Sequence, residues 1–306
     1  MSWSRGFEDF VRQKVPLAER TTYRVGGPAE FYVQPPDEAT LGELLWRAAH
    51  AGLPVKFLGG GSNLLVGDEG VRGIVVRLPQ NGFGALRRHG NVIRAGAAHS
   101  LPRLVNWTVS EGLLGLECLQ GVPGTIGAAL RMNAGGKYGD VGRFVRHVRG
   151  FELDGKRFEF EMRECGFGYR HSKLAGRIVT ECEIELMPGN PETGRRLALD
   201  IDREKRASQP MDAHSAGCVF KNPSVPGVPS AGRLIDELGL KGHQVGGAAV
   251  SKMHANFLVN ENGASAQDLT TLIRDVRQRV FDARGVMLEL EIEVWGIPPE
   301  ELGAAV

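Results

Sequence analysis

The chain has 306 residues, of which 42% are hydrophobic and 24% charged, a balance typical of a globular protein of two or three domains. Its formal net charge of +1 gives no reason to expect a nucleic acid or an anionic membrane as a partner. Four scattered cysteines without a CxxC pair argue against a metal site. Together with the lack of an apolar signal core in residues 1–15, they favour a reducing, cytoplasmic compartment.

The first third of the chain predicts short strands around one helix. A strand is expected over residues 29–34, and Asp37 suits the N-cap of a helix that Gly52 ends. The helix would bury apolar side chains that recur at helical spacing, namely Leu41, Leu44, Leu45 and Ala48. Further strands are expected over residues 55–58, 64–66 and 74–78.

The middle third contains a hairpin signal and a boundary signal. Asp154-Gly155 separates two short stretches of strand-forming residues and predicts a tight β-hairpin. A strand is expected over residues 178–187. Pro188-Gly189-Asn190-Pro191 then interrupts the pattern, and a charged helix over residues 192–206 is expected after it. We therefore place a domain boundary at this interruption.

The last third has a clear helix followed by an alternating segment. The helix is expected over residues 267–283, with Ser265 as its cap and Gly285 at its end. Its buried stripe would comprise Leu269, Leu272, Ile273, Val276, Val280 and Phe281. Residues 286–294 alternate apolar and acidic side chains and predict a strand with Glu289, Glu291 and Glu293 on one face.

Two glycine-rich loops give the first functional signal. One loop follows a predicted strand, so its amides can form an anion-binding nest; it comprises Gly59, Gly60, Gly61, Ser62 and Asn63. It lacks the Lys-Ser/Thr pair of a Walker loop and the following helix of a Rossmann fingerprint. The other loop covers residues 121–129. Two such loops suit a long, diphosphate-containing cofactor; tight turns or dense backbone packing are the alternative interpretations.

Six segments together resemble the UDP-N-acetylenolpyruvoylglucosamine reductases and occur in that family's order. They are residues 22–27, 58–66, 121–139, 168–172, 215–223 and 252–260, and the resemblance extends over residues 20–296. It implies an α+β fold with a two-lobed FAD-binding domain of the PCMH/vanillyl-alcohol-oxidase type and a C-terminal α/β substrate-binding domain. The expected domains are residues 1–80 and 81–190 for the two lobes and 191–306 for the substrate. The short stretch after residue 170 is similar to the branch that lacks an inserted tyrosine-bearing lid loop.

The resemblance also implies the ligands and part of the site. FAD would be bound non-covalently, NADPH would be the hydride donor, and the substrate would be a UDP-sugar. Residues of both glycine loops would hold the FAD diphosphate, namely Gly59 to Asn63 together with Pro123, Gly124, Thr125, Ile126, Gly127 and Ala128, with Asn133 nearby. Tyr169, Lys221 and Asn222 would contact the UDP-sugar; lysine is a compact cation suited to a diphosphate.

The family's reaction reduces an enolpyruvyl ether to a lactyl ether, which requires stabilised negative charge and a proton donor. Arg170 matches the first need, because a guanidinium binds a carboxylate through two parallel hydrogen bonds. Taken alone, an arginine in such a loop is usually only solvated. Cys218 occupies a position where many members of the family have serine, and we expect it to donate the proton. A lone cysteine is otherwise usually a small buried apolar residue.

Glu291 matches the family's catalytic glutamate through the sequence 288–292, in which Leu290 replaces a common proline. A slip of one alternation would select Glu289 or Glu293 instead, and a solvent-facing edge strand is the structural alternative for all three. His254 is expected to be structural. The sequence does not distinguish NADPH from NADH, and it does not determine domain closure. We expect a monomer, although the sequence carries no direct signal for oligomeric state.

Three alternative functions remain open at this point. An oxidase of the same flavin fold could attach FAD covalently, and His99 beside the small residues 95–98 is the candidate. A nucleotide-sugar-binding regulator on the same scaffold would not need Arg170 and Glu291. A thiol enzyme that uses Cys218 would have only His214 nearby as a base and would leave the glycine loops unexplained.

Overall fold

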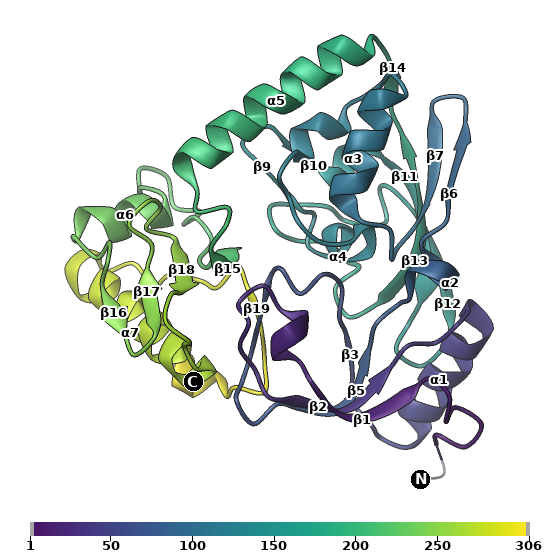
Figure 1. Cartoon of the computed structure of the whole chain (residues 1–306), viewed down its shortest axis with the longest axis horizontal. Coiled ribbons are helices and arrows are strands. Elements are labelled where there is room, and N and C mark those ends of the chain that lie inside the picture. The colour runs from purple at the N-terminus through teal and green to yellow at the C-terminus, as the bar shows by residue number, and fades with distance from the viewer. Residues whose placement is uncertain (1–2, 304–306) are drawn as a thin grey trace. The chain divides into compact units, whose positions relative to one another are not determined.

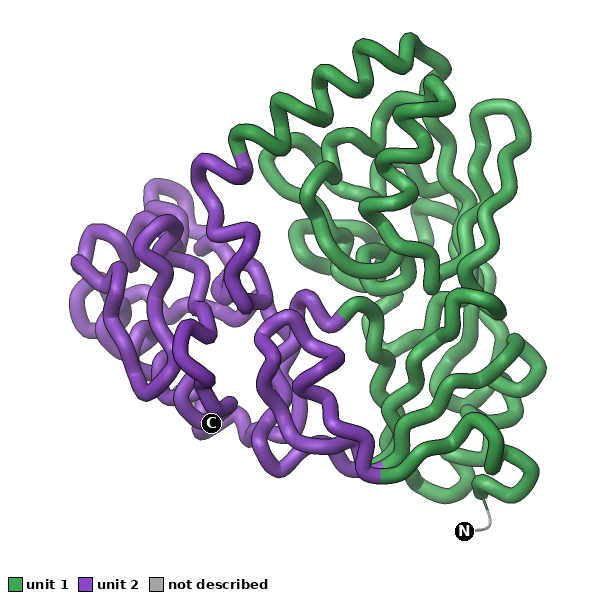
Figure 2. Tube along the Cα trace, viewed as in Figure 1, with its two compact units in different colours: residues 1–13, 31–60, 73–204 green, residues 14–30, 61–72, 205–306 purple. Residues whose placement is uncertain are grey.

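The computed structural model describes residues 3–303, which divide into two compact units (Figure 1; Figure 2). The first unit contains residues 3–13, 31–60 and 73–204, and the second contains residues 14–30, 61–72 and 205–303. Two short N-terminal segments therefore belong with the C-terminal third of the chain. The predicted ranges 1–80, 81–190 and 191–306 describe functional domains and stay a prediction; the compact units interleave along the chain instead.

A five-stranded antiparallel sheet lies at the centre of the first unit, in the order β12-β11-β13-β7-β6. The strands are β6 (Leu86–His89), β7 (Val92–Gly96), β11 (Val145–Phe151), β12 (Arg157–Glu161) and β13 (Ile178–Glu185). Phe151 pairs with Arg157 beside the Asp154-Gly155 turn, so the hairpin prediction is confirmed. The predicted strand over residues 178–187 is confirmed as β13.

Four helices of the first unit pack around this sheet and a second one. They are α1 (Glu38–His50), α2 (Gln80–Phe83), α3 (Leu101–Ser110) and α4 (Ile126–Arg131). In α1 the Asp37 carboxylate accepts a hydrogen bond from the Thr40 amide at 2.8 Å, and the four predicted stripe residues are fully buried. The prediction of this helix is confirmed. The short helix α4 packs against β7 and β13.

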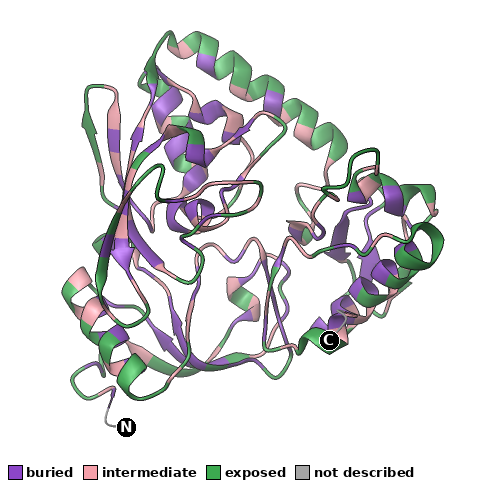
Figure 3. Ribbon diagram, turned by 180° about the vertical axis from the view of Figure 1, so that it is seen from behind, coloured by how far each residue is buried: buried purple, intermediate pink, exposed green. Residues whose placement is uncertain are grey.

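The second sheet has four strands in the order β1-β2-β5-β3. They are β1 (Val11–Pro16), β2 (Pro28–Val33), β3 (Val55–Phe57) and β5 (Val71–Val76). Smaller elements are η1 (Ala18–Arg20), η2 (Leu116–Leu119), η3 (Val141–Phe144), β8 (Leu113–Leu114), β14 (Met187–Pro188), β9 (Gly135–Gly136) and β10 (Gly139–Asp140). The long helix α5 (Pro191–Ser208) starts directly after the predicted boundary and is exposed along most of its length (Figure 3).

The second unit is an antiparallel sheet covered by helices, with the strand order β15-β18-β17-β16. Its strands are β15 (His214–Cys218), β16 (Gln244–Val245), β17 (Ala248–Val250) and β18 (Phe257–Asn260). Its helices are α6 (Ala231–Glu237), α7 (Ala266–Arg284) and η4 (Pro299–Leu302). A separate parallel pair joins β4 (Leu64–Val66) to β19 (Glu293–Trp295).

The helix α7 confirms the predicted caps. Ser265 and Asp268 form a reciprocal capping box at its start, and Gly285 ends it with a φ of 66°. The buried stripe is as predicted except for Phe281, which is 44% exposed. Within residues 3–303, none of the helices is both long and apolar enough to cross a membrane.

The predicted strand over residues 286–294 is wrong for most of its length. Only residues 293–295 form a strand, and Leu290 makes a single bridge to Phe220. The alternation of buried and exposed side chains is largely present, with Leu288 and Ile292 buried and Glu289 and Glu293 exposed. Burial on one side therefore produced the pattern, while the backbone bonds to two different short segments instead of one ladder.

Candidate active site

Gly59 and Gly60 of the first glycine loop pack closely against the second loop, within the first unit. A Cβ atom on Gly59 would lie 2.6 Å from the Cβ of Ala128 and 2.9 Å from the Thr125 hydroxyl. A Cβ on Gly60 would lie 2.6 Å from the Cα of Gly124. Side chains do not tolerate such distances, so glycine is required at both positions. Dense backbone packing, one interpretation of these loops, is thus present.

The backbone of the second loop is partly committed to the fold. The Ile126 amide donates to the His99 carbonyl at 3.0 Å, and the Gly127 amide donates to the Ala97 carbonyl at 2.9 Å. These two amides are therefore not available to a phosphate. The buried Thr125 hydroxyl, in contrast, has no hydrogen-bond partner in the described part of the chain. Leaving a buried hydroxyl unpaired costs about 1–3 kcal/mol, which a bound ligand would offset.

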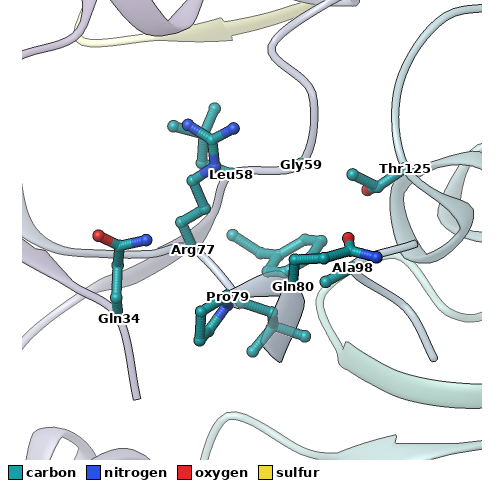
Figure 4. A pocket seen from close by; sticks show the side chains of 10 residues that line it. Gln34, Leu58, Gly59, Arg77, Pro79, Gln80, Ala98 and Thr125 are labelled. Atoms are coloured by element: carbon teal, nitrogen blue, oxygen red, sulfur yellow. The ribbon is translucent and has the colours of Figure 1, made fainter. Parts of the chain in front are cut away.

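Thr125 opens onto a cavity of about 230 Å³ in the first unit. Figure 4 shows Arg77 and Gln80 at one wall, with Thr125 on a separate segment across from them. The lining residues are Gln34, Phe57, Leu58, Gly59, Arg77, Leu78, Pro79, Gln80, Ala98 and Thr125. Within residues 3–303 the Arg77 guanidinium makes no hydrogen bond, ion pair or ring contact. An arginine without a counter-charge that lines the same cavity as an unpaired hydroxyl suits an anionic ligand.

The residues present therefore fit part of a dinucleotide cofactor. The cavity offers one cation, one hydroxyl and two side-chain amides, besides apolar walls at Phe57 and Leu78. Its volume is below the range of about 300–1,000 Å³ that is typical of pockets for whole small molecules, so it can hold only a portion of FAD. Sequence reasoning missed Arg77. The available signal was a single arginine within the apolar run 74–78.

Arg170 lies on a tight turn of the first unit, residues 168–171, which we call the arginine turn. The Gly168 amide donates to the His171 carbonyl at 2.9 Å, and the His171 amide donates back to Gly168 at 3.2 Å. Tyr169 is 58% exposed at the tip, and Arg170 has a φ of 51°. A side-chain-bearing residue in this left-handed region is strained by about 1–3 kcal/mol, and such strain clusters at functional sites.

Two buried side chains anchor the arginine turn. The Asn133 side chain accepts from the Gly142 amide and donates to the Gly168 carbonyl, both at 2.9 Å. The Ser172 hydroxyl donates to the Arg131 carbonyl at 2.7 Å. Asn133 was predicted to lie near the cofactor. That role stays a prediction, but its amide is already bonded to two backbone groups. Because Arg131 ends α4 and Thr125 precedes it, this helix joins the cavity to the arginine turn.

The second unit carries Cys218 at the end of β15, where residues 218–221 form what we call the cysteine segment. The Lys221 amide donates to the Glu289 carbonyl, and the Glu291 amide donates to the Val219 carbonyl, both at 2.8 Å. Backbone bonds thus place the segment that carries Glu291 beside the segment that carries Cys218 and Lys221. Cys218 itself is partly buried.

Asn63 also binds the backbone of the Glu291 segment. Its side-chain nitrogen donates to the Glu291 carbonyl at 3.2 Å, and its own carbonyl accepts from the Glu293 amide at 2.9 Å. Of the three alternating glutamates, Glu289 and Glu293 are exposed and Glu291 is partly buried. Partial burial between two bonded segments favours Glu291 over its neighbours, and the assignment stays a prediction.

The other predicted side chains have defined partners. Lys221 forms an ion pair with Glu289 at 3.5 Å, and the Asn222 side chain accepts from the Ala231 amide at 3.1 Å where α6 begins. His254 accepts from the Asn256 amide at 3.2 Å, and its ring lies edge-on to Phe257, as expected for a structural histidine. Among the described residues, no group of three or more His, Cys, Asp or Glu side chains could hold a metal ion.

Comparisons with known proteins define first a class and then a family. Residues 29–161 match the family described as FAD binding domain, so the chain is of the class of FAD-binding proteins. Residues 209–295 match the family described as UDP-N-acetylenolpyruvoylglucosamine reductase, C-terminal domain. The first match lies within the two predicted FAD-binding lobes, and the second lies within the predicted substrate-binding domain. The predicted FAD-binding fold with a C-terminal substrate-binding domain is confirmed.

Full-length relatives give the same result. A UDP-N-acetylenolpyruvoylglucosamine reductase from an Anaeromyxobacter strain is 42% identical over 96% of this chain and 92% of its own length. One from Moorella thermoacetica is 44% identical over 92% of each chain. The crystal structure of the reductase from Thermus caldophilus matches with a TM-score of 0.80 at 41% identity, covering 94% of this chain and all of that one. The chain belongs to the UDP-N-acetylenolpyruvoylglucosamine reductase family.

Proposed function

We propose that the chain reduces UDP-N-acetylenolpyruvoylglucosamine to UDP-N-acetylmuramate in peptidoglycan precursor synthesis, with Arg170, Cys218 and Glu291 as its catalytic residues. It is a flavin-dependent oxidoreductase that uses FAD, with NADPH as the reductant. The observation that carries the reaction is the match at 41–44% identity to reductases of this name over at least 92% of the chain. The oxidase and the non-catalytic binding protein are not favoured, because the relatives named here are reductases in both sequence and structure.

When bound, FAD supplies the hydride that reaches the enolpyruvyl group. The guanidinium of Arg170 would bind the substrate carboxylate and stabilise negative charge as it develops there. Cys218 would hold a proton for C2 of the reduced group, since a positioned thiol can act as a general acid. Glu291 would share in holding or moving this proton.

The substrate's remaining groups need a cation and neutral polar contacts. Lys221 would lie against the diphosphate as a compact point charge, while Tyr169 and Asn222 would contact the sugar and the nucleotide. In the first unit, Arg77 and Thr125 would bind oxygens of the FAD diphosphate or ribose. This assignment is supported by the unpaired guanidinium and the unpaired buried hydroxyl in one cavity.

An anaerobic two-step experiment tests the reaction. NADPH should bleach the yellow flavoprotein, and addition of UDP-N-acetylenolpyruvoylglucosamine should restore the colour, with the lactyl ether as the product. Unrelated enol ethers serve as the control and should leave the flavin bleached. Recolouring only when oxygen is admitted would favour an oxidase and contradict the proposal.

We also propose that the protein acts as a cytoplasmic monomer with no nucleic-acid or membrane partner. The near-neutral formal charge of +1 supports the absence of a polyanionic partner. Light scattering coupled to gel filtration, with and without FAD, tests the monomer: a mass of about 33 kDa is expected, and a stable dimer would contradict it.

A further inference from the structure

A buried asparagine binds the backbone just after Cys218. Asn256 is 3% exposed, and its side chain bonds both backbone groups of one residue, Phe220. Its oxygen accepts from the Phe220 amide at 3.0 Å, and its nitrogen donates to the Phe220 carbonyl at 2.8 Å. Its own carbonyl accepts from the Val219 amide at 2.9 Å. Three hydrogen bonds from one residue therefore hold residues 219 and 220.

This contact continues a strand pairing that would otherwise stop. The register of β15 with β18 ends at the pair Cys218–Phe257, after an irregularity between Ser215 and Cys218. Beyond this pair, the Asn256 side chain takes the place of a neighbouring strand. On the other edge, Val219 and Lys221 bond to Glu291 and Glu289. The cysteine segment is thus held on both edges, and the Glu291 segment depends on its position.

The side chain of Cys218 is short, so the position of its backbone determines where the thiol lies. Only one rotatable bond separates the Cys218 backbone from its sulfur, so the side chain cannot compensate for a displaced segment. A misplacement of about 1 Å can cost about 100-fold in rate. We propose that Asn256 is a positioning residue of the reductase site, which sets the place of the Cys218 thiol through Phe220 and that of Glu291 through Val219. This inference rests on the proposed function, since it takes Cys218 as the proton donor.

The first test compares Asn256→Ala with Asn260→Ala. Asn260 is a matched control, because its side chain also makes two backbone hydrogen bonds, to Tyr23 at 2.9 Å and from Ala264 at 2.8 Å. Neither bond touches the cysteine segment. With FAD bound, Asn256→Ala should bleach with NADPH at the wild-type rate but recolour with substrate about tenfold to 100-fold more slowly. Asn260→Ala should keep both rates even where its melting temperature falls equally. Equal recolouring in both variants would overturn the proposal.

A conservative variant separates positioning from folding. In Asn256→Asp, an ionised carboxylate accepts from the Phe220 amide but repels the Phe220 carbonyl, whereas the protonated acid can donate to it. Burial favours the neutral acid. The recolouring rate, taken as a ratio to wild type at the same pH, should therefore rise as the pH falls from 8 to 6. Taking the ratio cancels the pH dependence that the variant and the wild type share through the facing groups, namely His254, Lys221, Glu289, Glu291 and Cys218. A ratio independent of pH would count against the proposal.

A readout that needs no turnover distinguishes this inference from the proposed function. Failure of the proposed function would appear in the wild type, which would not recolour with the UDP-sugar. Failure of the inference would appear in the variant. Alkylation of Cys218 by iodoacetamide, followed by peptide mass spectrometry, should be several-fold faster in Asn256→Ala than in wild type or Asn260→Ala. Cys118 serves as the internal reference. An unchanged rate at Cys218 would overturn the inference in either case.

Discussion

The arginine turn of the first unit and the cysteine segment of the second are held in opposite ways. Asn133 and Ser172 anchor the arginine turn at its base, and Arg170 lies near the tip in a strained conformation. The cysteine segment is bonded along both edges, by Asn256 on one side and by residues 289–291 on the other.

The difference follows the length of the side chains. Arg170 has a long side chain that can adjust to its ligand, so anchoring the base of its turn is sufficient. Cys218 has a short one, and only the backbone can place its sulfur. The two proposed catalytic residues are therefore held differently, according to the length of each side chain.

The largest effect is expected at the rigid position. Cys218→Ala should slow recolouring about 10²- to 10⁴-fold, the usual contribution of a positioned proton donor. Cys218→Ser should keep substantial activity, because the hydroxyl occupies the same place. Single-turnover recolouring at matched flavin content measures both. If Cys218→Ala recolours as fast as wild type, Cys218 is a packing residue and does not donate the proton.

At the arginine turn, Arg170→Lys should leave bleaching by NADPH normal but slow recolouring about 10²- to 10³-fold. Lysine keeps the charge and loses the planar fork that binds both carboxylate oxygens. Arg163→Lys is the control, since the Arg163 side chain is 80% exposed and forms an ion pair with Glu161 at 3.0 Å in the same unit. Recolouring of Arg170→Lys at the wild-type rate would contradict the assignment.

Replacing the two anchoring residues, Asn133 and Asn256, should slow recolouring to different extents. Asn133→Ala leaves the Gly142 amide without its partner and the Gly168 carbonyl with only the His171 amide, and it should lower the free energy of unfolding by about 1–3 kcal/mol. Its recolouring rate should fall less than that of Asn256→Ala, because the long Arg170 side chain tolerates a shifted turn. Urea denaturation and single-turnover kinetics give the two quantities. Equal slowing of recolouring in Asn133→Ala and Asn256→Ala would contradict the expected difference between the two anchors.

The cavity of the first unit predicts a defect in cofactor binding. Arg77→Gln should weaken FAD binding about tenfold to 100-fold, since hydrogen bonds to a charged group contribute about 1.5–3 kcal/mol. Arg72→Gln is the control, since Arg72 has an exposed side chain on β5, the strand that ends at Val76 directly before Arg77. Titration of the apoprotein with FAD, followed by flavin fluorescence, measures the affinity. An unchanged dissociation constant for Arg77→Gln would exclude Arg77 from the cofactor site.

The smallest effect concerns stability against pH at His254, beside the cysteine segment. Burial, and then repulsion by Lys241, lower the pKa of His254, so its ring takes up a proton at a lower pH in the folded chain than in the unfolded chain. Below about pH 6.5 the unfolded chain binds a proton that the folded chain does not, and stability falls as the pH falls. His254→Gln should reduce this loss by at most about 1.4 kcal/mol per pH unit. Urea denaturation at pH 7 and 5.5 checks it, and identical slopes would contradict it.

Elements set by local interactions could be predicted from the sequence. The caps of α1 and α7 and the turn at Asp154-Gly155 depend on residues within a few positions of one another, and all three are confirmed. The segment 286–294 could not be predicted, because its backbone partners lie in residues 219–221 and at Asn63. Asn63 and Glu291 are 228 positions apart.

In the candidate site, too, the sequence predicted some residues and missed those that depend on tertiary contacts. Sequence motifs selected Arg170, Cys218 and Glu291, whose roles remain predictions. Motifs did not select Arg77 or Asn256. Arg77 is identified by the cavity that it lines, and Asn256 by its burial and the backbone partners that only the fold supplies. Asn256 is 36 positions from Phe220, and no periodicity links the two. Residues that support a site through tertiary contacts carry little signal in a single sequence.

The interleaved composition of the second unit bears on how the protein is made. Its N-terminal segments have hydrogen-bond partners near the other end of the chain. The carbonyl of Tyr23 accepts from the Asn260 side chain, 237 positions later, and the Asp68 carboxylate accepts from the Ala266 amide, 198 positions later. At about 5–20 residues per second, a ribosome needs roughly 10–50 s to supply these partners. Throughout that time residues 14–30 and 61–72 can bond to each other but lack the C-terminal residues that pack on them, so the apolar side chains of Tyr23 and Leu65 lack part of their core. Nascent chains of this enzyme should therefore depend on chaperones until synthesis is nearly complete, whereas the first unit has all its residues by position 204.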